Sequence, residues 1–195
     1  MEGKNETNAI VEVEEINPIT ETDWTKRIEL VKEITAKNCS KTEFELLCYT
    51  ALQYGLNPLK KEIWAVKYQG SPANIMVGRD GYLSIASRSK EFDGMDTTYN
   101  PSPVKEGSPR LIGVDTESSA TCTVYRKGVG HPITVTVYMK EYYNGISPVW
   151  KQKPITMLCK VSESQALRKA FNISGVYSEE ELSLARLSQE EKKND

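Results

Sequence analysis

The sequence has a single histidine, His131, among its 195 residues. A hydrolase that relies on a histidine base would depend on this residue, which lies in the segment Gly-Val-Gly-His-Pro at residues 128–132. A segment of this composition is typical of a turn between strands, where histidine usually makes an ordinary structural hydrogen bond. The sequence therefore favours a turn histidine over a catalytic one.

Cysteine is also scarce, and none of the four cysteines forms a Cys-x-x-Cys pair. Zinc centres usually use closely spaced cysteine and histidine ligands, so no zinc site is expected and the thiols are expected to be buried or half-buried. The sequence also lacks the patterns G-x-x-x-x-G-K-[ST] and G-x-G-x-x-G, which bind nucleotide phosphates. These absences argue against a nucleotide-dependent enzyme, and no enzyme activity is expected.

Long apolar runs are missing, because no stretch reaches the roughly 18 residues that a membrane-spanning helix needs. The first residues, Met-Glu-Gly-Lys-Asn-Glu-Thr, are polar and acidic and have the features of neither an export signal nor a transit peptide. We therefore expect a cytoplasmic protein with no membrane partner.

Charge is segregated along the chain although the total is only -2. Residues 1–23 contain seven acidic side chains and one basic, and residues 179–195 contain six acidic and three basic. The middle is therefore basic, which suggests a polyanionic partner. We expect a disordered acidic segment at 1–22, a core domain at 23–178 and an acidic helix or tail at 179–195. Two interpretations of the acidic ends stay open. They cover the basic face or recruit other proteins, or they only increase solubility.

Helical spacing is clear in four segments. A capping-box pattern at Ser40 opens a helix that Gly55 would end, Asp80 is expected to cap a helix reaching about Lys90, and Pro154 suits the first turn of another. A helix is expected over residues 23–37, with Trp24, Ile28, Val31 and Ile34 on one face.

Strand signals occur in pairs. Residues 63–68 and 73–77 form one expected hairpin, and residues 120–125 and 133–138 form a second whose faces alternate between apolar and Thr/Tyr side chains. Residues 92–95 are predicted to form a turn, and residues 100–110 a loop. Helices mixed with strands that pair as hairpins predict an α+β fold, with a small antiparallel sheet packed against helices.

Basic residues recur beside aromatic ones through the middle of the chain, as in Lys60-Lys61 before Trp64 and Lys151 after Trp150. Single-stranded nucleic acid needs this combination, since cations bind its phosphates and flat side chains stack on its bases. The pattern alone is weak, because such tryptophans are more often part of a core.

An ordered set of motifs strengthens this interpretation. The set begins with Tyr-Gly-Leu-Asn-Pro at 54–58, Lys-Glu-Ile-Trp-Ala at 61–65 and Val-Gly-Arg-Asp-Gly at 77–81. It continues with Phe-Asp-Gly-Met at 92–95, Tyr-Arg-Lys at 125–127, and matches from Trp150 to Gly-Val-Tyr at 175–177. Over residues 40–177 the sequence resembles the phage single-strand annealing proteins of the Red-beta/RecT family, specifically its Bet branch.

The resemblance implies ATP-independent binding and annealing of complementary single-stranded DNA in phage-type homologous recombination. It implies self-assembly into a ring or helical filament, and partnership with a phage 5′–3′ exonuclease and a host single-strand-binding protein. The gene would be carried by a phage or prophage of a bacterial or archaeal host. No cofactor is expected to be required, although acidic residues near phosphates leave room for Mg²⁺ to assist annealing.

Roles in DNA binding follow from the resemblance residue by residue. Gln165 is expected to give polar support to the groove and Trp150 to shape it or stack on a base, while the Bet pattern is more basic just after Pro154 than this sequence. Contacts with the DNA backbone are expected from Lys61, Arg126, Lys127, Lys153, Lys160 and Arg168.

Two other classes of function stay open at this stage. The first is an adaptor that binds single-stranded DNA without promoting annealing. The second is a metal-dependent nuclease, for which Asp80, Asp93 and Asp96 would have to converge.

Overall fold

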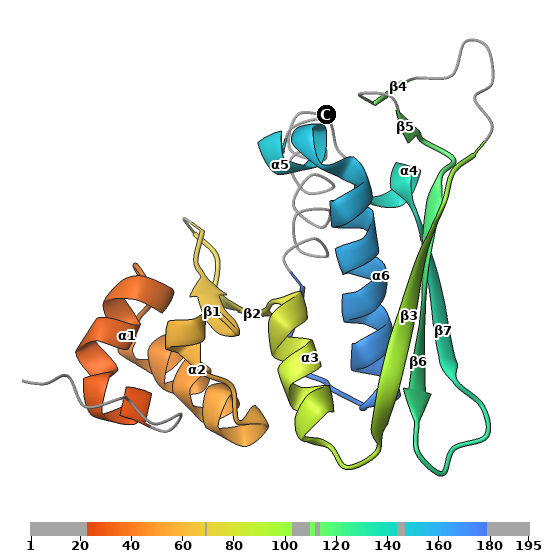
Figure 1. Ribbon diagram of the computed structural model, residues 1–195. Coiled ribbons are helices and arrows are strands. Elements are labelled where there is room, and N and C mark those ends of the chain that lie inside the picture. Colours follow the sequence, from red (N-terminus) through yellow and green to blue (C-terminus); the bar gives the residue numbers. More distant parts are fainter. Residues whose placement is uncertain (1–22, 69, 103–109, 112–113, 144–146, 179–195) are drawn as a thin grey trace, which may run out of the picture.

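The computed structural model describes residues 23–68, 70–102, 110–111, 114–143 and 147–178. Two groups of elements lie side by side, with α1, α2 and the β1–β2 hairpin in one and α6 with a three-stranded sheet in the other (Figure 1). The elements in chain order are η1 (Asp23–Arg27), α1 (Ile28–Thr35), α2 (Lys41–Tyr54), η2 (Pro58–Lys60), β1 (Ile63–Val66), β2 (Asn74–Val77), α3 (Arg79–Arg88), β3 (Phe92–Asn100), β4 (Arg110–Leu111), β5 (Val114–Asp115), β6 (Ser119–Arg126), β7 (Ile133–Tyr138), α4 (Met139–Tyr142), α5 (Pro148–Gln152) and α6 (Pro154–Ala170).

Helix α2 begins and ends as its sequence predicts. The Ser40 hydroxyl accepts a hydrogen bond from the Glu43 backbone N–H at 3.3 Å, and the Glu43 carboxylate accepts one from the Ser40 N–H at 2.7 Å. This reciprocal pair satisfies two backbone donors at the start of the helix. Gly55 ends the helix with φ 61°, in the left-handed region that glycine adopts most easily.

Glu43 also fixes the β1–β2 hairpin to α2. Its carboxylate accepts hydrogen bonds from the Lys67 ammonium at 2.7 Å and from the Ala73 backbone N–H at 2.9 Å. The hydrogen bond from Lys67, followed by those from the Ser40 and Ala73 N–H groups, lowers the pKa of Glu43 from 4.5 to about 2. One carboxylate therefore connects the start of α2 to both ends of the hairpin loop.

The larger sheet is antiparallel with strand order β3-β6-β7. Its inner face is apolar and packs against α6, and includes Ala120, Cys122, Val124, Val135 and Val137. Its outer face carries threonines that pair across β6 and β7, Thr121 with Thr136 at 2.9 Å and Thr123 with Thr134 at 3.0 Å. The predicted hairpin with one apolar and one Thr/Tyr face is therefore confirmed.

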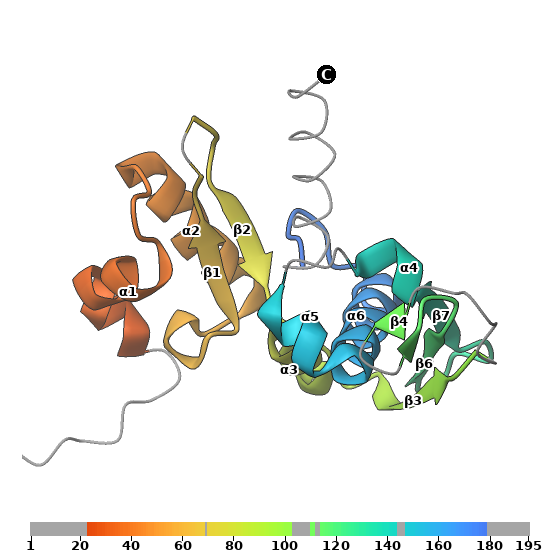
Figure 2. The ribbon, with the colours of Figure 1, turned by 90° about the horizontal axis from the view of Figure 1, so that it is seen from above.

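Helix α6 lies between this sheet and α3, as both views show (Figures 1 and 2). Small buried residues, Ser162, Ser164, Ala166 and Ala170, occur beside the larger Leu158, Val161 and Leu167. Short side chains allow neighbouring backbones to approach closely, so α6 can be covered on more than one side.

After α6 the chain returns to the first group of elements. Tyr177 forms a parallel bridge with Met76 on β2, with Val77 N–H donating to the Tyr177 carbonyl at 2.9 Å. The Tyr54 hydroxyl at the end of α2 donates to the Ser174 carbonyl at 2.6 Å. These contacts connect the two groups of elements.

The predicted α+β class is confirmed, as are the helix starting at Pro154 and both hairpins. Residues 92–95 were wrongly predicted to form a turn. They begin β3, and Gly94 is tolerated there because the register shifts between Phe92 and Gly94.

Two details of the predicted helices also differ. Gly78 rather than Asp80 occupies the N-cap of α3, and Asp80 lies in its first turn. The helix predicted over residues 23–37 is the 3-10 helix η1 followed by α1, which ends at Thr35. Of its apolar residues, Trp24 and Val31 are buried, and Ile28 and Ile34 are 39% and 55% exposed. The predicted segments 1–22 and 179–195 lie outside the described residues.

Candidate nucleic-acid interface

Helix α6 and its N-cap residue carry four of the eight residues expected to bind DNA. Pro154 occupies its first turn, where a missing N–H costs nothing, and its last turn carries Arg168 and Lys169. Lys153 at the N-cap and Lys160 in the middle are exposed, whereas Gln165 and Arg168 are partly buried. At 1.5 Å per residue, Lys153 and Arg168 lie about 22 Å apart along the helix, which is long enough for contacts with several successive phosphates.

Arg126 and Lys127 lie at the end of α6 that carries Arg168. The Arg126 guanidinium lies 5.6 Å from the ring centroid of Phe171, which directly follows α6. Its Nε donates to the Glu91 carboxylate at 3.1 Å, and its Nη2 also pairs with that carboxylate. The exposed Lys127 donates its backbone N–H to the Glu91 carbonyl at 2.7 Å.

Glu91 therefore neutralises part of this basic corner. A phosphate that contacts Arg126 would have to share its guanidinium with Glu91, while Lys127 has no ion pair within the described part of the chain. Lys127 is accordingly the more available cation of the two.

Gln165 and Trp150 have structural neighbours that sequence alone does not reveal. The Gln165 side-chain amide donates to the Tyr142 hydroxyl, which ties α6 to α4. Trp150 in α5 is 4% exposed and belongs to the hydrophobic core. In this conformation its indole can shape the surface above it but offers no face for a base to stack on.

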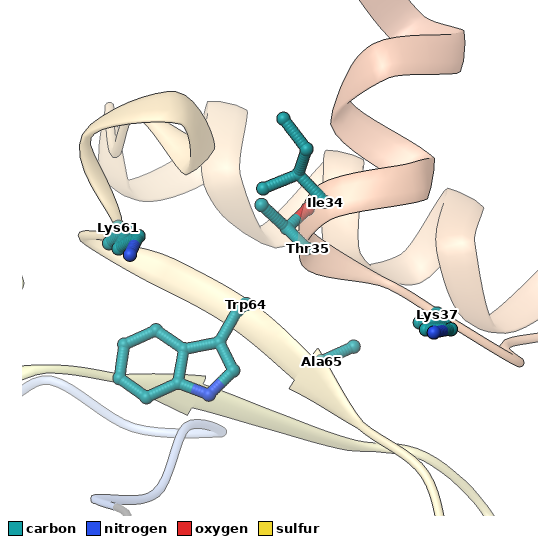
Figure 3. Close-up of a pocket in the computed structure, with 6 residues that line it drawn as sticks. All are labelled: Ile34, Thr35, Lys37, Lys61, Trp64 and Ala65. Atoms are coloured by element: carbon teal, nitrogen blue, oxygen red, sulfur yellow. The ribbon is translucent and has the colours of Figure 1, made fainter.

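Lys61 lies apart from the α6 residues, in the first group of elements. It follows η2 with φ 58°, a left-handed conformation that is uncommon for a residue with a side chain. It lines a groove with residues of α1 and β1 (Figure 3). Of the eight predicted contacts, the structure therefore places Lys153, Lys160, Gln165 and Arg168 on one helix, Arg126 and Lys127 at its end, and Lys61 and Trp150 elsewhere.

Arg79 is a cation whose role the sequence did not reveal. From the first residue of α3 its guanidinium pairs with Asp80 at 3.0 Å and with Glu163 of α6 at 3.5 Å. Because Arg79 and Glu163 lie far apart in sequence, their ion pair cannot be predicted from local spacing. The helical spacing of Lys160, Glu163 and Arg168 indicates only that an acidic side chain lies near the basic ones on α6.

Two of the three acids of the nuclease alternative have different partners. Asp80 is paired with Arg79, and Asp96 on β3 accepts a hydrogen bond from Tyr125, an interaction that raises the pKa of the tyrosine. Across the described ranges, no three His, Cys, Asp or Glu side chains form a group that could hold a metal ion.

No helix within those ranges is both long and apolar enough to cross a membrane.

None of the four cysteines forms a disulfide, and all are buried or half-buried, as the sequence predicts. Cys39 and Cys122 are buried, and Cys48 and Cys159 are partly buried. Burial is the main cause that raises the pKa of each thiol, so the thiolate form is disfavoured.

These observations define a class: a small α+β protein in which one central helix, supported by a three-stranded sheet, presents several cations to solvent. A sequence model of the RecT family matches residues 23–195, and this chain belongs to that family.

Two curated relatives are similar over most of this chain. The recombination protein bet of Escherichia phage lambda is 32% identical over 153 residues, which cover 74% of this chain and 52% of the relative. An uncharacterized protein of Ureaplasma parvum serovar 3 is 28% identical over 154 residues, covering 79% of this chain and 63% of that protein. The chain thus spans about half to two thirds of the length of these relatives.

Proposed function

We propose that this protein binds single-stranded DNA and promotes the annealing of complementary strands without ATP, as a step in phage-type homologous recombination. Membership of the RecT family and similarity to a phage recombination protein support the proposal. The structural observation that carries it is the line of cations along α6, which continues at its C-terminal end into Arg126 and Lys127.

Annealing suits a protein without a catalytic nucleophile. Base-pair formation is favourable by about 1.4 kcal/mol of stacking per step, so no external energy source is needed. The barrier is the repulsion of two phosphate backbones and the disorder of the single strands. The line of cations along α6 lowers that repulsion and keeps one DNA strand extended, with its bases accessible to a complementary strand.

Self-assembly would extend this effect. The cations from Lys153 to Arg168 span about 22 Å, so a single subunit can align only a few nucleotides. A ring or helical filament of subunits would join many such surfaces and raise the effective concentration of matching bases. We further propose that a phage 5′–3′ exonuclease supplies the single strands and that a host single-strand-binding protein is a second partner, with Mg²⁺ assisting by screening phosphates.

A mixing experiment with two complementary oligonucleotides, one carrying a donor dye and one an acceptor, tests the proposal. Without ATP, the wild-type protein is expected to accelerate the rise in energy transfer relative to the strands alone. The double variant Lys160→Gln/Arg168→Gln should lose most of the acceleration, while Lys41→Gln, which changes an 88% exposed lysine on α2, should keep it. No acceleration by folded wild-type protein would refute annealing.

A second candidate is an adaptor that binds single strands without pairing them. It is favoured by the ion pairs of Arg126 with Glu91 and of Arg79 with Glu163, which reduce the positive charge available to a second backbone. Fluorescence anisotropy of the same oligonucleotides distinguishes the two, because the adaptor would bind single strands and leave the pairing rate unchanged.

A further inference from the structure

An open groove lies on the first group of elements, away from α6. It has a volume of about 350 Å³ and is bordered by α1, by the turn after η2 and by β1. Its lining residues are Ile34, Thr35, Lys37, Lys61, Trp64 and Ala65. This volume falls in the range of roughly 300–1,000 Å³ that is typical of pockets for small organic groups.

Two cations flank the apolar wall of this groove. Figure 3 shows Lys61 near one end of β1 and Lys37 near the other, with Trp64 and Ala65 between them. Both lysines are exposed, and neither has an ion pair within the described residues. The Lys61 backbone is fixed by its N–H bond to the Pro58 carbonyl at 3.0 Å. The groove therefore combines an apolar surface with positive charge on both sides, which is complementary to a planar group joined to anions.

Trp64 is the flat side chain of the groove. Its six-membered ring lies against Gly78, where an added Cβ would be 3.3 Å from Cζ3, so one edge of the ring is held in place. The indole is partly exposed, whereas the other two tryptophans, Trp24 and Trp150, are 3% and 4% exposed. Trp64 is thus the tryptophan that solvent and a ligand can reach, and holding its ring reduces the entropy lost on binding.

We propose that this groove is a nucleotide subsite for single-stranded DNA, in which a base stacks on Trp64 while neighbouring phosphates bind Lys37 and Lys61. The inference rests on the proposed function and adds a contact of a different kind. The α6 cations attract the backbone, and the groove takes one base out of the stack and fixes the path of the strand across the first group of elements. Aromatic stacking accepts any base, so the site needs no sequence preference.

Intrinsic tryptophan fluorescence provides the test, because Trp64 dominates any change caused by an external ligand. An oligothymidine is expected to quench the emission, and an abasic oligomer of the same length is expected to bind through its phosphates without the same quenching. Trp64→Phe should abolish the quenching while binding persists. Trp64→Leu should weaken binding roughly tenfold, and Lys37→Gln should weaken it less, with Lys41→Gln as the control that leaves it unchanged.

The outcomes separate this inference from the proposed function. If anisotropy reports binding while the emission stays constant and Trp64→Leu binds like wild type, the subsite is wrong and DNA binding stands. Equal quenching by the abasic oligomer would also refute base stacking, and quenching by polyglutamate but not by oligothymidine would make the groove a peptide site. If no oligonucleotide binds at all, both the proposed function and the inference fail.

Discussion

Replacing Gly81 with alanine tests the close contact between the start of α3 and the residues at the two ends of the β1–β2 hairpin. Gly81 lies in the first turn of α3 and is buried. A Cβ at this position would lie 2.8 Å from Cγ1 of Val77 and closer still to the carbonyl oxygen of Glu62. Real Cβ atoms essentially never come within 3.0 Å of such neighbours, so the backbone before β1 or the start of α3 would have to move.

Two opposing effects determine the size of the change. Alanine is favoured over glycine in a helix by about 1 kcal/mol, so propensity alone predicts a more stable protein. The clash opposes this gain, since the Glu62 carbonyl also accepts the Gly78 N–H at 3.2 Å and cannot shift without weakening that bond. Overpacking costs about 1–3 kcal/mol, and the clash with a backbone oxygen rather than a flexible side chain places this case at about 2–3 kcal/mol. After the gain in propensity, we expect Gly81→Ala to destabilise the protein by roughly 1–2 kcal/mol.

Urea unfolding followed by far-UV circular dichroism measures this difference. The matched control is Gly130→Ala, because Gly130 has no heavy atom within 4 Å of the added Cβ and no positive φ. That variant should be unchanged or up to about 1 kcal/mol more stable, through lower entropy of its unfolded chain. If Gly81→Ala proves as stable as Gly130→Ala, the tight contact between α3 and the residue before β1 is incorrect.

Three further predictions concern the cap, the hairpin and the basic helix. Ser40→Ala should destabilise the protein by about 1 kcal/mol through loss of the α2 cap, as thermal unfolding would reveal. Glu43→Gln should lower the free energy of unfolding at neutral pH, because the pKa of Glu43 is about 2 in the folded protein and 4.5 ordinarily. In urea unfolding, the difference in this free energy between variant and wild type should shrink as the pH falls below 4.5 and be lost as the pH falls through about 2. Lys160→Gln should reduce the slope of log affinity against log salt by about 0.7 in anisotropy titrations, and Lys41→Gln should leave it unchanged; equal slopes for both would remove Lys160 from the interface.

Local signals in the sequence predicted much of the secondary structure. Ser40 and Glu43 stand at the spacing of a capping box, Pro154 at the start of a helix, and the alternation at 120–125 and 133–138 is strong enough to define a two-faced hairpin. Each of these signals involves residues close in sequence, so local backbone geometry alone determines the helix start or the strand. Strand β3 was missed because Phe92-Asp93-Gly94 is typical of a turn, and its pairing with β6 depends on residues 19 to 34 positions away.

The candidate site was less accessible to sequence reasoning. Periodicity could place Lys160 and Arg168 on one helix, but the Glu91 carboxylate beside Arg126 and the Tyr142 hydroxyl beside Gln165 come from other elements. Burial of Trp150 also depends on packing between α5 and α6, which composition cannot distinguish from exposure. The groove of Lys37, Lys61 and Trp64 forms only when α1 approaches β1.

The bridge between Met76 and Tyr177 has a consequence for how the chain reaches its native state. It joins positions about a hundred residues apart, so a large loop must close before β2 gains this neighbour. Contacts of such long range slow the search for the native topology, and β2 is expected to be protected from hydrogen exchange later than the β6–β7 hairpin during refolding. A nascent chain that has been synthesised only as far as α3 would therefore lack Tyr177, whose backbone pairs with β2 and completes the β1–β2 sheet.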